Sequence, residues 1–441
     1  MTTAQRGLSL HSATNITKFL ETSFAPNPVV QFCIANRMVK YASVCTMAEF
    51  SISSSVVRSK MPELDTLRGI AVLLVLFFHG FNLVPISHEI SSTAGRLWVV
   101  ITSTGWMGVN LFFVLSGFLI TGILIESRET PNYFKRFYFR RALRILPAYY
   151  AILLVLVLVT YFGLEDRRVG WPFIGLSFIY LANVTPLFGV VSQYSTLWSL
   201  AVEEHFYLLW PAAVRYVSRR TLLYTCLVII IACPVLRALY YVRGYAYGAP
   251  YTWLVADPLA CGAVLAILVR GPIASRTKLL AFASLTFGAG ILVFLIGLPF
   301  GIYLSRTWSG GTLRYTFLNL IFVGVIAGTL YVGTGAFARW VNIGWLQFFG
   351  EISYGLYLVH RVTFDVVDHA GRKLFPATFA TTWHMGQVAI RFVIGGALAV
   401  LVAFMSRWYF EERFLRLKNR AFAASIPGFV GKKAAPNYQP D

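Results

Sequence analysis

The chain has 441 residues, of which 57% are hydrophobic and only 13% are charged. The mean hydropathy of +0.66 and many apolar runs near 20 residues exclude a soluble globular protein, because a helix needs about 20 apolar residues to cross ~30 Å of hydrocarbon. The 38 basic residues outnumber the 18 acidic ones, but they cluster between apolar runs and therefore indicate membrane topology. We expect membrane lipids, and no nucleic acid, as partners.

The N-terminal residues 1–60 contain neither a secretory signal nor a spanning run, and they are rich in Ser, Thr and Ala. We expect this segment to be disordered. A weak organellar presequence stays open, but Met61 directly precedes the first predicted helix and is the better candidate for a start site. The cysteines have no metal-binding spacing, so we expect neither disulfides nor a metal site; they stand at 33, 45, 226, 233 and 261.

Ten apolar runs from residue 67 onward predict membrane-spanning helices. They cover residues 67–86, 98–125, 143–162, 197–215, 222–242, 251–269, 279–298, 313–333, 343–363 and 387–410.

A further run at 172–184 is marginal in length, and charge decides how it lies. If it crossed the membrane, the basic cluster at 215–220 would lie outside; if it is re-entrant or interfacial, all the basic clusters face the cytoplasm, as the positive-inside rule requires. We therefore expect an all-α polytopic membrane protein of about ten helices with both termini inside. The expected membrane domain covers 61–415, and 416–441 form a cytoplasmic tail.

The first helix carries two cations at an informative spacing. Arg68 lies eleven residues before His79, and residues 69–78 are apolar or glycine. Eleven residues at about 100° each return to within about 20° of the starting direction, so both side chains share one face about 16 Å apart. His79 then lies near mid-bilayer, where an ionisable side chain costs at least ~2.5 kcal/mol and marks a candidate functional site.

Other polar residues are also predicted to lie within the membrane. Ser116 in the second helix shares the depth of His79, and Glu203 and Glu204 lie about 9 Å below the outer surface in the fourth. Buried carboxylates need a cation, hydrogen bonds or a proton, and beside an imidazole they can serve as acid or base partners. We therefore take His79, Ser116, Glu203 and Glu204 as catalytic candidates.

Both ends of this polar set extend toward a membrane surface. Asp257 and His360 lie in the outer halves of their helices and are candidates for binding an acceptor. Arg141 and Arg144 stand one turn apart at the start of the third helix, on the cytoplasmic side. Such a pair can hold phosphate through charge-assisted, often bidentate hydrogen bonds.

Each candidate also has a structural interpretation. Basic residues at a helix base often contact lipid headgroups, an intramembrane histidine or serine can serve helix packing alone, and paired carboxylates can be neutralised by arginines. Composition and spacing leave these alternatives open.

Five stretches together resemble the integral-membrane acyltransferase-3 family, whose members O-acylate sugars. The resemblance covers about residues 62–415 and rests on residues 64–71 leading to His79, and on 108–120, 140–147, 197–208 and 352–360.

The resemblance implies acyl-CoA, commonly acetyl-CoA, as a cytoplasmic donor substrate, with no bound cofactor. It implies a hydroxyl of a polysaccharide, or of a glycoside that can be lipid-linked, as the acceptor, and a location in the bacterial inner membrane. By position, Arg68 and His79 match the family's Arg-to-His motif. Arg141 and Arg144 match its Arg-x-x-Arg motif, and Glu203 matches its buried acid.

Three positions depart from the family pattern. Thr66 stands where glycine is common, Asn110 where an acid is frequent, and His205 where glutamine is usual. We take Asn110 as a further acceptor-binding candidate, and these departures leave the acceptor preference open.

The expected reaction places the phosphates of CoA on the arginine pair and the thioester at His79, which Glu203 or Glu204 would orient as a general base. Direct transfer and a covalent acyl-His79 or acyl-Ser116 intermediate both stay open. The alternative from another class is a transporter or flippase of a lipid-linked sugar that uses the same residues as a proton relay.

Overall fold

The computed structural model describes residues 57–82 except 59, and residues 93–163, 169–191, 194, 196–244, 250–376 and 385–423. Helices make up the secondary structure of these residues, and no β-strand occurs among them. This confirms the all-α fold class. The segments expected to be disordered or to form a tail, 1–60 and 416–441, lie largely outside the described residues, so those expectations stay predictions.

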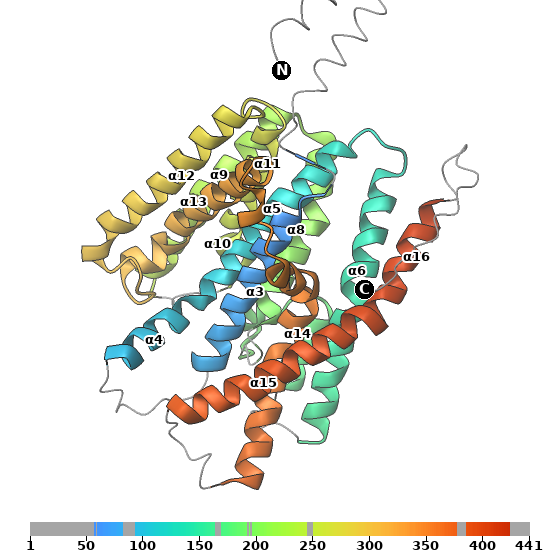
Figure 1. Cartoon of the computed structure of the whole chain (residues 1–441), viewed down its shortest axis with the longest axis vertical. Coiled ribbons are helices and arrows are strands. Elements are labelled where there is room, and N and C mark those ends of the chain that lie inside the picture. The colour runs from blue at the N-terminus through green and yellow to red at the C-terminus, as the bar shows by residue number, and fades with distance from the viewer. Residues whose placement is uncertain are drawn as a thin grey trace, which may run out of the picture. The chain divides into compact units, whose positions relative to one another are not determined.

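Figure 1 colours the helices in chain order. The α-helices are α3 (Pro62–Asn82), α4 (Thr93–Ser103), α5 (Met107–Glu126), α6 (Tyr133–Tyr161), α7 (Trp171–Phe178), α8 (Leu197–Tyr216), α9 (Arg219–Val242), α10 (Thr252–Val255), α11 (Asp257–Val269), α12 (Arg276–Gly297), α13 (Trp308–Gly333), α14 (Gly344–Leu374), α15 (Met385–Met405) and α16 (Glu412–Ala423). Short 3-10 turns η1 to η4 (Thr104–Trp106, Thr185–Phe188, Leu298–Phe300 and Ala338–Trp340) and a π-helical turn η5 (Ser406–Glu411) join several of them.

Each of the ten predicted ranges coincides with a helix or a pair of consecutive helices. Among the described residues, seven helical segments are long and apolar enough to cross a membrane. α8 and α14 are not among these seven, and α11 has only 13 residues. The protein is therefore a membrane protein, and the count of ten crossings stays a prediction.

The doubtful run at 172–184 contains only the short helix α7. Its 8 residues extend for about 12 Å at 1.5 Å per residue, which is too short to cross ~30 Å of hydrocarbon. The chain then turns at Tyr180, which has a positive φ of 58°. This geometry agrees with a re-entrant or interfacial segment.

The centre of the helical unit is formed by α3 and α5. α3 packs most extensively on α14 and also on α5, while α5 packs on α11 and α8, as Figure 1 shows for the blue and cyan helices. In the spans that contain α3 and α5, 61% and 72% of the apolar 18-residue stretch is buried, whereas only 17% of the corresponding stretch of α12 is buried. α12 is therefore peripheral, with apolar side chains free to contact lipid.

Glycines allow the central helices to approach one another closely. A β-carbon at Gly117 of α5 or at Gly262 of α11 would lie 2.0 Å from a carbonyl oxygen of the other helix. Gly69 of α3 and Gly350 of α14 have the same arrangement, at 2.0 and 2.1 Å. Small residues at such crossings allow tight packing in membranes, where little hydrophobic force joins helices.

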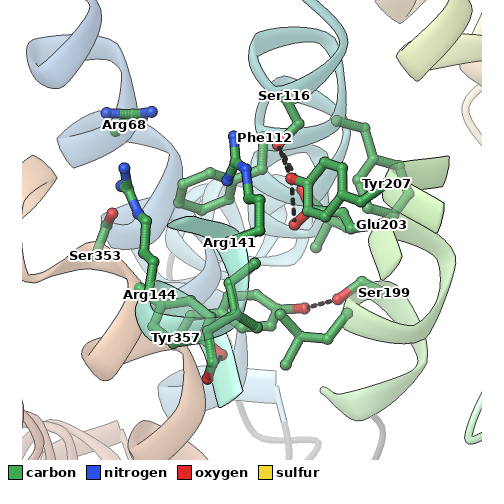
Figure 2. Close-up of a pocket in the computed structure, with 15 residues that line it drawn as sticks. Arg68, Phe112, Ser116, Arg141, Arg144, Ser199, Glu203, Tyr207, Ser353 and Tyr357 are labelled. Atoms are coloured by element: carbon green, nitrogen blue, oxygen red, sulfur yellow. Dashed lines mark hydrogen bonds between the residues drawn. The ribbon is translucent and has the colours of Figure 1, made fainter. Parts of the chain in front are cut away.

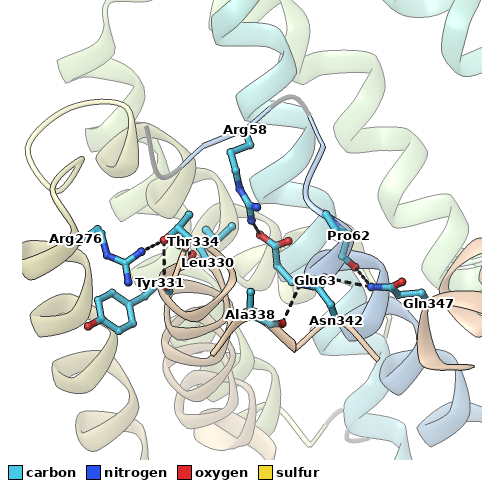
Figure 3. A network of polar contacts seen from close by, with 10 residues as sticks. All are labelled: Arg58, Pro62, Glu63, Arg276, Leu330, Tyr331, Thr334, Ala338, Asn342 and Gln347. Atoms are coloured by element: carbon cyan, nitrogen blue, oxygen red, sulfur yellow. Dashed lines mark hydrogen bonds and ion pairs between the residues drawn. The ribbon is translucent and has the colours of Figure 1, made fainter. Parts of the chain in front are cut away.

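A polar network anchors the first turn of α3 (Figure 3). The carboxylate of Glu63 is fully buried and accepts a hydrogen bond from Arg58. Gly333 leaves room for this pair, because a β-carbon there would lie 2.8 Å from the Glu63 carboxyl carbon. Gln347 of α14 donates to the carbonyl oxygen of Pro62. These contacts fix the end of α3 from which Arg68 projects.

Candidate active site

A cavity of about 100 Å³ lies between α3, α5, α6, α8 and α14 (Figure 2). A buried site needs only about 10–15 Å³ of such space to hold one water molecule, so this cavity can admit a small substrate group. Five residues predicted to be functional line it: Arg68, Ser116, Arg141, Arg144 and Glu203. The other polar lining residues are Ser199, Tyr207, Ser353, Tyr354 and Tyr357.

One face of α8 supplies three of the lining residues. Ser199, Glu203 and Tyr207 are spaced by four residues, which places them on one side of a helix about 6 Å apart. The sequence predicts Glu203 as a site residue but neither Ser199 nor Tyr207. The four-residue spacing from Glu203 is the signal that could have identified them.

Ser116, Glu203 and Tyr207 form a hydrogen-bonded group. Ser116 Oγ donates to Glu203 Oε1 at 2.7 Å, and Tyr207 Oη lies 3.0 Å from Ser116 Oγ and 3.2 Å from Glu203 Oε2. The only proton of the Ser116 hydroxyl is thus directed at a carboxylate. Such a carboxylate can act as a general base for that hydroxyl.

Arg141 and Arg144 bring positive charge to the cavity that contains Glu203. Within the described residues, no carboxylate lies within ion-pair distance of either guanidinium, whereas Arg68 pairs with Asp65 at 2.7 Å. The guanidinium of Arg141 lies 4.7 Å from the centroid of the Tyr207 ring. Unpaired guanidinium groups at a cavity are suited to binding an anion, phosphate above all.

The arginine pair also lines a second cavity of about 380 Å³. Arg136, Arg140 and Tyr133 of α6 and Glu126 at the end of α5 line this larger space. Arg141 and Arg144 therefore line both the larger, basic cavity and the smaller cavity that contains Ser116. A long anionic ligand could contact both.

His79 and His360 form a pair of hydrogen-bonded rings, with centroids 4.9 Å apart and planes tilted by 55°. His360 Nδ1 is 3.0 Å from the carbonyl oxygen of Leu356, so this nitrogen carries the proton and Nε2 is an acceptor. His79 Nδ1 lies 3.2 Å from that Nε2 and 3.0 Å from the carbonyl oxygen of Val75, so it donates to both. When both rings are neutral, the free electron pair of the His79 ring is therefore on Nε2 and can accept a proton.

The histidine pair lies beyond the wall of the cavity. Neither ring lines the cavity, but Tyr357 does; its ring centroid is 5.8 Å from that of His360, and its hydroxyl bonds to Ser199. We expected Glu203 or Glu204 to orient His79, and the structure gives that position to His360. Sequence predicts the depth of a residue along its helix but not the rotation of the helix about its axis.

Asp257 and Asn110 meet in a separate buried network. Arg237 binds the Asp257 carboxylate at 2.9 and 3.1 Å, and Asn319 joins Asp257 to Asn110 at 3.0 and 3.3 Å. Neither Asp257, Asn110 nor Glu204 lines the cavity. The first two connect α5, α9, α11 and α13, so the structure shows for them a helix-joining role.

The buried pair of Arg391 and Asp368, which the sequence did not predict, holds the backbone next to His79. Arg391 of α15 is 1% exposed, binds both oxygens of Asp368 at 2.6 and 2.9 Å, and donates to the carbonyl oxygen of Gly80 at 2.5 Å. Gly80 directly follows His79. An arginine within the apolar run at 387–410 was the available signal.

The helices and the cavity define an integral membrane protein with a polar site between its helices, suited to chemistry between a hydroxyl, a carboxylate and an anionic ligand. Residues 61–408 match the acyltransferase domain family, and the chain belongs to that family. This match confirms the resemblance found in the sequence and the prediction that the protein is an acyltransferase.

Curated relatives have related descriptions. The chain is 29% identical over 375 residues to a peptidoglycan O-acetyltransferase of Listeria monocytogenes, with 76% of this chain and 55% of the relative covered. It is 27% identical to a putative peptidoglycan O-acetyltransferase of Bacillus subtilis, with 83% and 56% covered, and 28% identical to a putative O-acetyltransferase of Staphylococcus aureus, with 84% and 60% covered. The chain thus spans little more than half the length of these relatives. No solved structure matches it.

Proposed function

We propose that the chain transfers an acyl group, in the first instance acetyl, from acyl-CoA to a hydroxyl of a carbohydrate-containing acceptor. The observation that carries this proposal is the arginine pair without a carboxylate at ion-pair distance, which lines both cavities and shares one of them with Ser116 and Glu203. An anionic donor with a reactive arm fits this arrangement. The phosphates would neutralise the guanidiniums, and the arm would extend to the hydroxyl and the carboxylate.

The donor would enter from the cytoplasm, with both chain termini on that side. Arg141 and Arg144 would hold its phosphate groups, and Arg68 lines the same smaller cavity. Arg136 and Arg140 would add positive potential in the larger cavity. Each charge-assisted hydrogen bond to such a phosphate contributes about 1.5–3 kcal/mol.

The acceptor would react on the side of the histidine pair. His79 Nε2 has the free lone pair that a general base needs, and general-base catalysis contributes roughly 10²- to 10⁴-fold. Two relatives are described as peptidoglycan O-acetyltransferases, one of them putatively, so a cell-wall glycan, or a lipid-linked precursor of one, is the acceptor class we propose. The bacterial inner membrane is the corresponding location. Membership of the acyltransferase family favours transfer over the transporter alternative.

The test compares two donors on purified protein in detergent, with peptidoglycan fragments as acceptor. Arg141→Ala and Arg144→Ala should each raise KM for acetyl-CoA about 10- to 100-fold, since each removes a charge-assisted hydrogen bond. The same variants should change KM little for S-acetyl-pantetheine, which has the reactive arm but no phosphate. Lys135→Ala is the matched control, because Lys135 is an exposed base of α6 that lines neither cavity.

Equal effects of the arginine variants on both donors would show that the pair does not bind phosphate. Release of no thiol from acetyl-CoA, with any glycan offered, would overturn the proposed function itself.

A further inference from the structure

Ser116 differs from the other serines that line the smaller cavity. Its hydroxyl donates to the Glu203 carboxylate at 2.7 Å, whereas Ser353 donates to the backbone carbonyl of Gly350 on its own helix. Ser199 bonds to the hydroxyl of Tyr357. Among the described serines that line this cavity, Ser116 is therefore the one whose hydroxyl is placed against a base. The hydroxyl of Tyr207 also donates to Glu203, over a longer distance of 3.2 Å.

The geometry separates the donor side from the histidine pair. Ser116 lines the same cavity as Arg141 and Arg144, which we propose as the donor-binding pair. His79 does not line it, whereas Tyr357 does, and the Tyr357 ring lies 5.8 Å from that of His360, the partner of His79. A thioester held by the arginines therefore meets Ser116 before any acceptor activated by His79.

We propose that Ser116 is a covalent acyl carrier, so that transfer proceeds in two steps through an acyl-Ser116 ester. This inference rests on the proposed function. In the first step, Ser116 Oγ attacks the carbonyl carbon of the acyl thioester and its proton passes to Glu203. The carbon–sulfur bond breaks, and the thiolate leaves with the proton that Glu203 received.

In the second step, the acceptor hydroxyl attacks the acyl carbon of the Ser116 ester. His79 takes the proton of the attacking hydroxyl and releases it to solvent. The bond between the acyl carbon and Ser116 Oγ breaks, and Glu203 passes a proton from solvent to Ser116 as its hydroxyl re-forms. The sum of the two steps is thioester plus alcohol to ester plus thiol, with no further reactant. Tyr207, 3.0 Å from Ser116 Oγ, positions the serine in both steps.

The experiment measures thiol release from acetyl-CoA without acceptor, together with the site of the retained label, on the full chain in detergent. The wild-type protein should release a burst of one thiol per protein and retain radiolabelled acetyl on the peptide containing Ser116. Ser116→Ala should abolish the burst and the label, and lower transfer by more than about 100-fold. His79→Ala should keep the burst and slow the transfer to acceptor.

Ser116→Cys tests the proposal without relying on the folding of the alanine variant. It keeps a nucleophile of similar size, and it should convert the label from an ester, stable to neutral hydroxylamine, into a thioester that hydroxylamine cleaves. Ser353→Ala removes a hydroxyl from the same cavity wall and should leave the label on Ser116.

Transfer to the acceptor by wild-type protein without a burst or label would overturn the carrier and leave the proposed function standing. A label in the Ser116→Cys variant that stays stable to neutral hydroxylamine would place the ester on another residue and overturn the carrier as well. If no thioester is consumed at all, the proposed function fails.

Discussion

Replacing Gly117 with alanine should separate α5 from α11 and displace the neighbouring Ser116. A β-carbon at Gly117 would lie 2.0 Å from the carbonyl oxygen of Leu259, whereas ordinary contacts begin at 3.4 Å. The helices must therefore move apart by about 1.4 Å, the difference between these two distances. A backbone oxygen within a helix cannot rotate away as a side chain can, so the helix itself has to shift.

The magnitude of the effect follows from that shift. Overpacking a tightly fitted contact costs about 1–3 kcal/mol of stability. The catalytic cost should be larger, since a misplacement of about 1 Å at a reacting group can lower the rate by roughly 10²-fold. Gly117→Ala should therefore lose most of the transfer activity under conditions where the protein remains folded.

The assay pairs acetyl transfer with thermal unfolding in detergent, and Gly288→Ala is the matched control. A β-carbon at Gly288 of α12 meets no atom within 4 Å. Alanine is also favoured over glycine in a helix by about 0.5–1 kcal/mol. The control should keep its activity and lose no stability.

Full activity and full stability in Gly117→Ala would refute the close approach of α5 and α11. An equal loss in Gly288→Ala would refute the steric explanation, because the control has open space where Gly117 has a backbone oxygen.

Three further predictions concern charged groups. Asp257→Asn leaves buried Arg237 without its counter-charge and should destabilise the protein by about 3–5 kcal/mol; thermal unfolding followed by tryptophan fluorescence measures this, and an unchanged midpoint would contradict it. Arg58→Ala leaves Glu63 buried without its donor and should lower the free energy of unfolding by roughly 1–3 kcal/mol. Adding Glu63→Gln should recover most of that loss. If the double variant is less stable than Arg58→Ala, the pairing argument is wrong. Arg144→Lys keeps the charge but loses the planar fork, so its KM for acetyl-CoA should lie between those of wild type and Arg144→Ala; a KM equal to that of the wild type would rule out bidentate binding.

The sequence predicts the helices well where apolar residues define them, and less well where polar residues continue them. α6 begins at Tyr133, about ten residues before the predicted start at 143, because Lys and Arg are good helix formers that hydropathy does not detect. Arg141 and Arg144 are therefore within the body of a helix and not at its start. α14 likewise extends to Leu374, beyond the predicted end at 363.

For the candidate site, the sequence predicts residues better than it predicts their partners. Ser116, Glu203 and Arg141 were all candidates, and the structure brings them to one cavity. His79 and His360 were also candidates, but their direct contact was not predicted. Depth in the membrane follows from counting residues along one helix, whereas partners depend on how each helix is rotated and which helix lies beside it. Those are tertiary properties.

Pairing is what separates structural charges from candidate functional ones inside this protein. Arg237 and Arg391 each bind both oxygens of a buried aspartate, so their charge is neutralised within the fold and joins helices. Arg141 and Arg144, in the same described set, have no carboxylate at ion-pair distance and line cavities instead. Keeping a charge unpaired inside a membrane protein is costly unless a ligand neutralises it. Hydropathy treats these four arginines alike, and only their partners distinguish the two that bind an aspartate from the two that have no carboxylate at ion-pair distance.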